Sequence, residues 1–261
     1  MATTDNSESK SNRLPKALEY HLRALTRFVL VQTEEEYLLI ESFAQALPKF
    51  RDYSWVFNQE YGLQPIAKHL EQLQKGSCHS CTRAESSDSK PSDRSTHSAM
   101  DTIVGHNPRE REYFYLLTDP EVWFEDAYMA RRLINLAMQL LHNDDQSVVK
   151  CLIFIGHPSV RVPAKLRQIF EVVEYNPNDS WVIGEVEKVA QETMKLSGME
   201  IPSDLSLFHG LTSYEVDSVI TQNIVRVKEP GAPCPHPRLD SGVVGSLREA
   251  RLQLRGPKGT F

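Results

Sequence analysis

The sequence contains no segment able to cross a membrane as a helix, no secretion signal and no excess of positive charge. None of its apolar runs approaches the roughly 20 residues that a transmembrane helix needs. Residues 1–13 are polar and lack the apolar core of a signal peptide, so we predict a cytoplasmic protein. A formal net charge of −6 argues against a nucleic-acid partner, whose phosphates require a basic surface.

Cysteine is also scarce, with four residues that form no evident disulfide framework. Cys151 lies in the apolar run 148–155, which predicts a small buried hydrophobic side chain. Cys78 and Cys81 form a Cys-x-x-Cys motif, and Cys234 with His236 could complete a zinc site. Exposed, reduced thiols are the alternative for this pair, because a second closely spaced cysteine pair is missing.

The absence of glycine matters most after the first apolar strand. Residues 28–33 are apolar and β-branched, and they run directly into Glu34, Glu35 and Glu36 at the start of a predicted helix. A phosphate-binding α/β domain has glycines, a lysine and a Ser or Thr at this junction. Carboxylates repel phosphate, and a chain without glycine closes less easily around an anion. No Gly-x-x-x-x-Gly-Lys-Ser/Thr motif occurs in the sequence, and residues 256–260 lack both the spacing and the preceding strand.

Hydrophobic periodicity alternates between strands and helices along residues 15–175. The predicted strands are 28–33, 53–58, 113–119, 148–155 and 170–175, and the predicted helices are 15–25, 37–47, 63–73 and 126–141. This alternation predicts a three-layer α/β sandwich with a mostly parallel, five-stranded sheet. A small helical region follows, whose last helix opens with the capping box Thr212-x-x-Glu215.

Composition suggests where the chain divides. We predict a disordered tail at 1–13, an α/β domain at 14–176, a helical subdomain at 177–228 and an irregular tail at 229–261. Residues 76–100 have almost no core-forming side chains, so burial cannot offset the entropy lost on ordering them. They are predicted to be a low-complexity insertion within the α/β domain.

A series of short motifs then points to one family. In chain order they are Thr33-Glu34-Glu35, the strand ending at Asp119, Gly156-His157-Pro158, Val162-Pro163-Ala164-Lys165-Leu166 and Gly210-Leu211-Thr212-x-x-Glu215. From about Leu18 to Val227 the chain resembles the N-terminal half of the cyanobacterial and chloroplast-encoded (ycf-type) AAA ATPases. In that family a degenerate, P-loop-free module precedes the catalytic ATPase module. The resemblance therefore implies a degenerate AAA-like fold without the catalytic half, although the insertion departs from the family.

The resemblance also suggests site residues. Asp119 takes the place of the Walker B carboxylate that holds Mg²⁺, and His157 lies near the place of the residue that senses the γ-phosphate. Asp119 and Glu121, with Glu125 and Asp126 nearby, are either a residual nucleotide or metal site or ordinary charges at helix N-termini. His157 could act as a general base or be a loop histidine hydrogen-bonded to its surroundings.

Two further sets of residues are candidate interfaces. Trp123 and Phe124 follow a strand and either anchor a partner or pack in the core. The segment that contains Lys165 and Arg167 corresponds, by resemblance, to one that packs at a subunit interface near the nucleotide.

Three functions follow from these observations. The favoured one is a non-catalytic protein–protein interaction and assembly module that needs no cofactor and acts with itself or with a separate AAA ATPase. The second is a regulator that binds ATP and Mg²⁺ through Asp119, with Lys165, Arg161 or Arg167 reaching phosphate. The third is a metal-assisted hydrolase that uses Asp119, Glu121 and His157. Only the first requires no residue that the sequence lacks.

Overall fold

Apolar, β-branched runs form the strands of a six-stranded sheet with the order β3-β2-β4-β5-β1-β6. The strands are β1 (Phe28–Gln32), β2 (Ser54–Asn58), β3 (Gly62–Pro65), β4 (Tyr113–Thr118), β5 (Lys150–Gly156) and β6 (Glu171–Glu174). Only β3 is antiparallel to its neighbour. Every residue of β1 and β5 is buried, as expected for central strands covered on both faces. The predicted α/β class with a mostly parallel sheet is confirmed.

The structure is a computed structural model, and it divides into two units, Met1–Tyr175 and Asn176–Phe261. The residues described are 14, 16–24, 26–46, 53–76, 94–106, 113–141, 150–175, 180–196, 201–202 and 204–228. The predicted tails at 1–13 and 229–261 and most of the predicted insertion lie outside these residues. Among the described helices, none combines the length and the apolar character needed to span a membrane.

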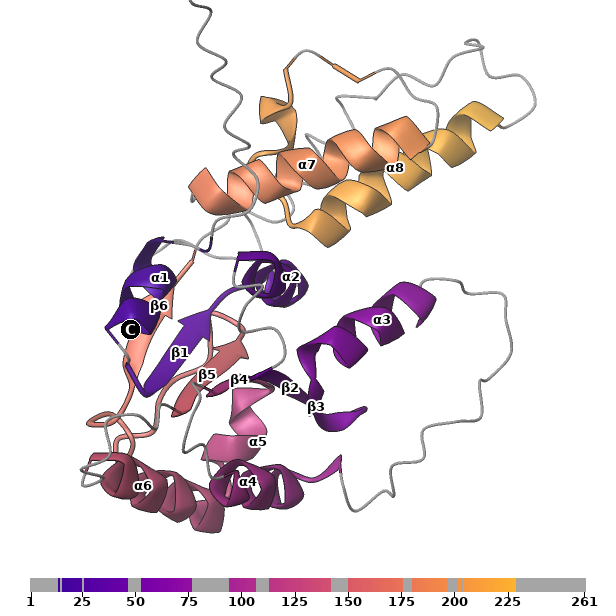
Figure 1. The fold of residues 1–261 in the computed structure, drawn as a ribbon. Helices are drawn as coiled ribbons and strands as arrows, with labels where there is room; N and C mark the ends of the chain where they lie inside the picture. The colour runs from indigo at the N-terminus through magenta and orange to yellow at the C-terminus, as the bar shows by residue number, and fades with distance from the viewer. Residues whose placement is uncertain are drawn as a thin grey trace, which may run out of the picture. The chain divides into compact units, whose positions relative to one another are not determined.

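Helices cover both faces of the sheet in the first unit (Figure 1). They are α1 (Lys16–Arg23), α2 (Glu36–Ala46), α3 (Ile66–Gly76), α4 (Thr96–Gly105), α5 (Pro120–Phe124) and α6 (Ala127–Leu141). Tyr115 and Leu117 of β4 pack in one core with residues of α4, α5 and α6. Phe114 points to the opposite face because strand side chains alternate, and its ring lies 5.6 Å from that of Phe43 in α2. The unit is therefore a three-layer sandwich.

The sixth strand, β3, is missing from the five strands predicted. Residues 63–73 were predicted to be one helix, but the helix begins only at Ile66. Gly62 adopts a positive φ of 73°, and the Tyr61 amide donates to Asn58 Oδ1 at 2.8 Å, which together form a tight turn between β2 and β3. Pro65 lies at the end of β3, an edge strand, where a missing N–H is tolerated.

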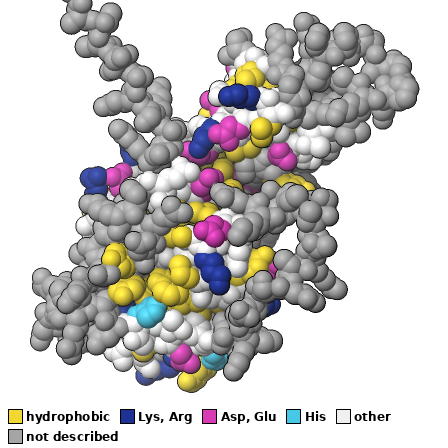
Figure 2. Space-filling view, turned by 45° about the vertical axis from the view of Figure 1, so that its right-hand side comes forward, with side chains coloured by type: hydrophobic (Ala, Val, Ile, Leu, Met, Phe, Trp, Pro, Cys, Tyr) yellow, Lys and Arg dark blue, Asp and Glu magenta, His cyan; other side chains and the backbone are white. Residues whose placement is uncertain are grey.

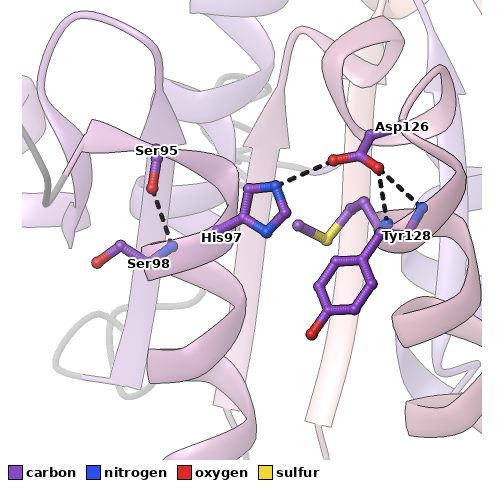
Figure 3. A network of polar contacts seen from close by, with 6 residues as sticks. Ser95, His97, Ser98, Asp126 and Tyr128 are labelled. Carbon is purple, nitrogen blue, oxygen red and sulfur yellow. Dashed lines mark hydrogen bonds and ion pairs between the residues drawn. The ribbon is translucent and has the colours of Figure 1, made fainter.

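The predicted insertion at 76–100 is also too long at its C-terminal end. Residues 96–100 belong to α4, whose Ala99 and Met100 are buried in the core. The Ser95 side chain caps this helix by accepting a hydrogen bond from the Ser98 amide at 3.1 Å (Figure 3). The sequence signal that could have predicted this helix is a polar N-cap, Ser95, followed by a short apolar stripe.

Contacts at both ends hold α4 in place. At its N-terminal end, His97 Nε2 lies 3.0 Å from Asp126 Oδ2, and Asp126 Oδ1 accepts hydrogen bonds from the Tyr128 and Met129 amides at the start of α6 (Figure 3). At its C-terminal end, the buried Lys150 Nζ donates to the carbonyls of Ile103 at 2.7 Å and Val104 at 3.2 Å. A cation at a helix C-terminus is favourable because it faces the negative end of the helix dipole.

In the part of the second unit that the structure describes, there are two helices and a short 3₁₀ turn. These are α7 (Ser180–Leu196), η3 (Ser206–Phe208) and α8 (Ser213–Lys228), and they share a small apolar core. The predicted capping box is confirmed. The Glu215 amide donates to Thr212 Oγ1 at 3.2 Å, and the Thr212 amide donates to Glu215 Oε2 at 2.7 Å.

The carboxyl end of β5 makes a close contact that yields the first prediction. A Cβ atom added at Gly156 would lie 2.5 Å from Pro120 Cγ and 2.8 Å from Pro120 Cδ. The proline ring is rigid and buried at the start of α5, so it cannot move aside easily. We expect Gly156→Ala to destabilise the protein by about 1–3 kcal/mol in urea unfolding.

Gly105→Ala is the matched control, because no atom lies within 4 Å of a Cβ built at the last residue of α4. This variant should unfold at the wild-type midpoint or slightly above it. Equal midpoints for the two variants would show that the contact between Gly156 and Pro120 does not constrain the fold.

Candidate functional site

The end of β1 turns into α2 without glycine. The Thr33 amide donates to the Gly156 carbonyl at 2.8 Å, and Thr33 Oγ1 accepts from the Glu35 amide at 3.0 Å. The Glu35 carbonyl then accepts the first helical hydrogen bond, from Leu39 at 3.0 Å. The threonine side chain thus closes the turn over the amide of Glu35, which a phosphate-binding loop would leave free for an anion.

Asp119 lies at the corresponding turn after β4. Its backbone is left-handed, with φ 53° and ψ 58°, and it is the one residue other than glycine with positive φ in the described part of the chain. Aspartate tolerates this conformation better than most residues do. Pro120 then starts α5 at a position where a proline needs no N–H donor. The turn exposes the side chains of Asp119 and Glu121.

Glu36, at the turn after β1, interacts electrostatically with the carboxylates of the turn after β4. Burial, followed by repulsion from Asp119 and then from Glu121, raises the pKa of the Glu36 carboxyl from 4.5 to about 7. The negative charges of three carboxylates therefore interact at the carboxyl edge of the sheet, although β5 lies between β1 and β4. The sequence placed Glu36 in the first turn of a helix, where its charge would repel phosphate, but nothing in the sequence revealed its proximity to Asp119.

These carboxylates do not form a metal site. Within the described ranges, no group of three or more His, Cys, Asp or Glu side chains is arranged to hold a metal ion. Neither Glu36 with Asp119 and Glu121, nor the predicted set of Asp119, Glu121 and His157, meets this requirement. The candidate zinc ligands Cys78, Cys81, Cys234 and His236 lie outside the described residues.

His157 interacts with its own turn. Its Nδ1 lies 2.8 Å from Ser159 Oγ and accepts a hydrogen bond from the Ser159 amide at 3.2 Å. The ring is exposed, and this nitrogen is already engaged in the turn. The geometry matches a loop histidine hydrogen-bonded to its surroundings, one of the two alternatives that the sequence left open.

The candidate aromatic interface is instead part of the core. Trp123 is 0% exposed and Phe124 is 7% exposed. The ring of Phe154 in β5 lies 5.8 Å from that of Trp123 and 5.4 Å from that of Phe124. The short helix α5 turns both side chains onto the sheet, so neither can anchor a partner. Asp126 likewise caps α6, as the alternative of a helix N-terminal charge predicted.

Basic residues gather in the connection between β5 and β6. Lys165 and Arg167 are exposed, and Arg161 and Arg167 line a cavity of about 320 Å³. The other lining residues are Leu30, Gln32, Val162, Val172 and Glu174. The basic residues could be read singly from the sequence, but their association with β1 and β6 could not, because pairing between strands cannot be deduced from periodicity alone.

Charge is mixed over the face of the molecule drawn in Figure 2. Among the described residues, Asp and Glu side chains there alternate with Lys and Arg side chains and with hydrophobic ones. On that face the basic side chains do not merge into a continuous patch.

Comparison with known proteins identifies the first unit. The family model described as SpoVK-like AAA ATPase, N-terminal domain, matches residues 14–175, which is more than half of the chain. No curated protein matches the sequence.

Solved structures show weaker likenesses. AMPPCP-bound DnaA from Aquifex aeolicus is 12% identical, with 92% of this chain and 66% of that chain covered and a TM-score of 0.43. RuvB from Thermotoga maritima is also 12% identical, with 90% and 67% covered and a TM-score of 0.44. The chain thus spans about two thirds of the length of either protein, and TM-scores this low carry no weight for the fold or the site.

The carboxylate cluster makes stability depend on pH. Glu36 keeps its proton up to about pH 7 in the folded state but loses it near pH 4.5 when unfolded. Between these values the folded state binds more protons, so stability falls as pH rises. We expect Glu36→Gln to remove this loss and to stabilise the protein by about 1–3 kcal/mol at pH 8, with little effect at pH 4.

The measurement is urea unfolding of both proteins from pH 4 to pH 8. Glu121→Gln serves as the comparison, since it removes only the smallest of the three contributions to the Glu36 pKa and should stabilise the fold less. Parallel pH profiles for the wild type and Glu36→Gln would mean that the carboxylates do not interact in this way.

Proposed function

The chain belongs to the SpoVK-like AAA ATPase N-terminal domain family, and on this premise we propose that it is a non-catalytic interaction and assembly module with a degenerate AAA-like fold. It acts by binding further copies of itself or a protein partner, such as an AAA ATPase encoded separately, and it uses no nucleotide cofactor. We also propose that the protein is cytoplasmic and that it is similar to the N-terminal half of the ycf-type ATPases.

The observation that carries this proposal is the charge at the carboxyl edge of the sheet. Open α/β folds bind ligands at this edge, and phosphates are held there by free amides at a helix N-terminus. Here the helix N-terminus after β1 carries Glu36, and Asp119 and Glu121 add their charges to the same region. A triphosphate would be repelled by carboxylates instead of being held by amides and a lysine.

The remaining features agree with a binding role. His157 is engaged by Ser159, and the described residues hold no metal-binding group, so the hydrolase alternative has no assembled site to support it. The regulator alternative would need Lys165, Arg161 or Arg167 to bind phosphate, and Lys165 does not line the cavity beside β6. The two arginines lie with Gln32 and Glu174 around this cavity, and neither lines it together with Asp119.

The test is a thermal-shift titration with Mg-ATP together with light scattering of the same samples. A ligand at 100 times its Kd stabilises a fold by about 2.7 kcal/mol, which such a titration detects. We expect millimolar Mg-ATP to leave the melting temperature unchanged, and the mass in solution to exceed that of one chain, either alone or with a co-purifying protein.

Two further samples separate the alternatives. A shift that requires both Mg²⁺ and ATP would overturn the proposal in favour of the nucleotide-binding regulator. A shift with Mg²⁺ alone that Asp119→Asn abolishes would overturn it in favour of the metal-assisted hydrolase. Asp119 is exposed, and asparagine tolerates its left-handed backbone, so this variant should fold normally.

A further inference from the structure

A cavity lies at one end of the sheet, between strands β1 and β6 and the connection that joins β5 to β6. Leu30 of β1 pairs with Val172 of β6, and Gln32 pairs with Glu174. Paired residues of neighbouring strands share a face, so all four side chains line the same wall of the cavity. Gln32 is buried, and its Nε2 donates to the Val160 carbonyl, which ties the connection to β1.

The connection itself is strongly basic in an acidic chain. Residues 157–170 include Arg161, Lys165 and Arg167 but no Asp or Glu, whereas the whole chain has a net charge of −6. The Arg161 guanidinium is held by hydrogen bonds from Nη1 to the carbonyls of Pro158 at 2.5 Å and Val160 at 3.1 Å. It is thus oriented by backbone carbonyls instead of by an acidic side chain.

The two arginines that line the cavity form no ion pair with another described residue. Among the described residues, no carboxylate lies within ion-pair distance of Arg161 or Arg167, although Glu174 lines the same cavity. The three charged side chains therefore leave one net positive charge. Arginine binds carboxylates well because its planar fork can donate two parallel hydrogen bonds.

The strand beside this cavity, β6, is the last strand of the sheet among the described residues. Within the described part of the chain it pairs with β1 alone (Figure 1). Val172 is 51% exposed on the cavity side. A strand edge of this kind can accept an additional strand through backbone hydrogen bonds, with alternate side chains entering pockets on one face.

We propose that this edge binds an extended acidic segment of a partner protein, which adds to β6 as a further strand. A residue placed opposite Val172 would point to the cavity side, because pairing keeps side chains on the same face. A glutamate or aspartate there would meet the guanidinium groups of Arg161 and Arg167. In an added strand that alternates acidic and apolar residues, the acidic side chains then all face the cavity. This inference rests on the proposed interaction function and names the chemistry of the partner.

A labelled heptapeptide that alternates valine with glutamate, blocked at both ends, is the probe. Its binding to the full chain is followed by fluorescence anisotropy at low and high salt. We expect saturable binding that weakens with salt, since screening reduces attraction between exposed charges. Combining Arg161→Gln with Arg167→Gln should weaken binding at least tenfold, whereas Glu174→Gln should strengthen it by removing the carboxylate from the cavity.

Arg131→Gln is the control, because it removes one positive charge from an exposed site on α6. It should bind the peptide as the wild type does. Urea midpoints of all variants establish that they are folded, and Glu174→Gln tests the site by a gain in affinity that misfolding cannot produce.

Three results would overturn the inference even if the peptide binds. One is equal binding of a peptide with lysine in place of glutamate, and another is unchanged binding by the double arginine variant. The third is competition by free acetate as effective as that by unlabelled peptide, which would indicate a small-anion site. If the peptide fails to bind while Mg-ATP also leaves the chain unshifted, the docking site is wrong but the proposed function stands.

Discussion

The contact between Pro120 and Gly156 determines how the carboxyl edge of the sheet is built. Because position 156 has no side chain, the first turn of α5 can pack directly onto the end of β5. That approach requires the chain to leave β4 through the left-handed backbone of Asp119. The same turn buries Trp123 and presents Asp119 and Glu121 toward the start of α2, so packing on one side of the turn fixes the charges on the other.

The carboxyl edge has consequently become acidic. A phosphate site needs unpaired amides and positive charge, whereas here a threonine hydroxyl closes the turn after β1 and Glu36 begins the helix. Positive charge is found instead in the connection between β5 and β6, around a cavity that two arginines line. Acidic and basic side chains are thus concentrated at different places along this sheet.

Sequence predicted the strands well where apolar residues were continuous, as in β1 and β5, and the capping box of α8 was confirmed because its two residues are close in the chain. It failed for β3, where a glycine with positive φ redirected the chain just before a helical stripe began. The acidic cluster could be seen only in part. The repulsion between Glu36 and Asp119 depends on a sheet order in which β5 alone separates β1 from β4, and periodicity does not reveal that order.

Some features of the site residues could likewise be predicted from the sequence, and others depend on the fold. Nothing in the sequence told whether Trp123 and Phe124 are exposed or buried. In the structure the short helix α5 places both side chains in the core. The basic residues were visible singly, but the cavity depends on the pairing of β1 with β6, which sequence could not supply.

The contacts that hold α4 at both ends affect how the connection between α3 and α4 can change in length. His97 and Lys150 hold the helix through contacts made to α6 and β5, independently of the residues that precede it. The cost of joining α3 to α4 then grows only with the logarithm of the connecting length, by about 0.6 kcal/mol for each doubling. The length of this connection can therefore change without breaking the contacts that hold α4.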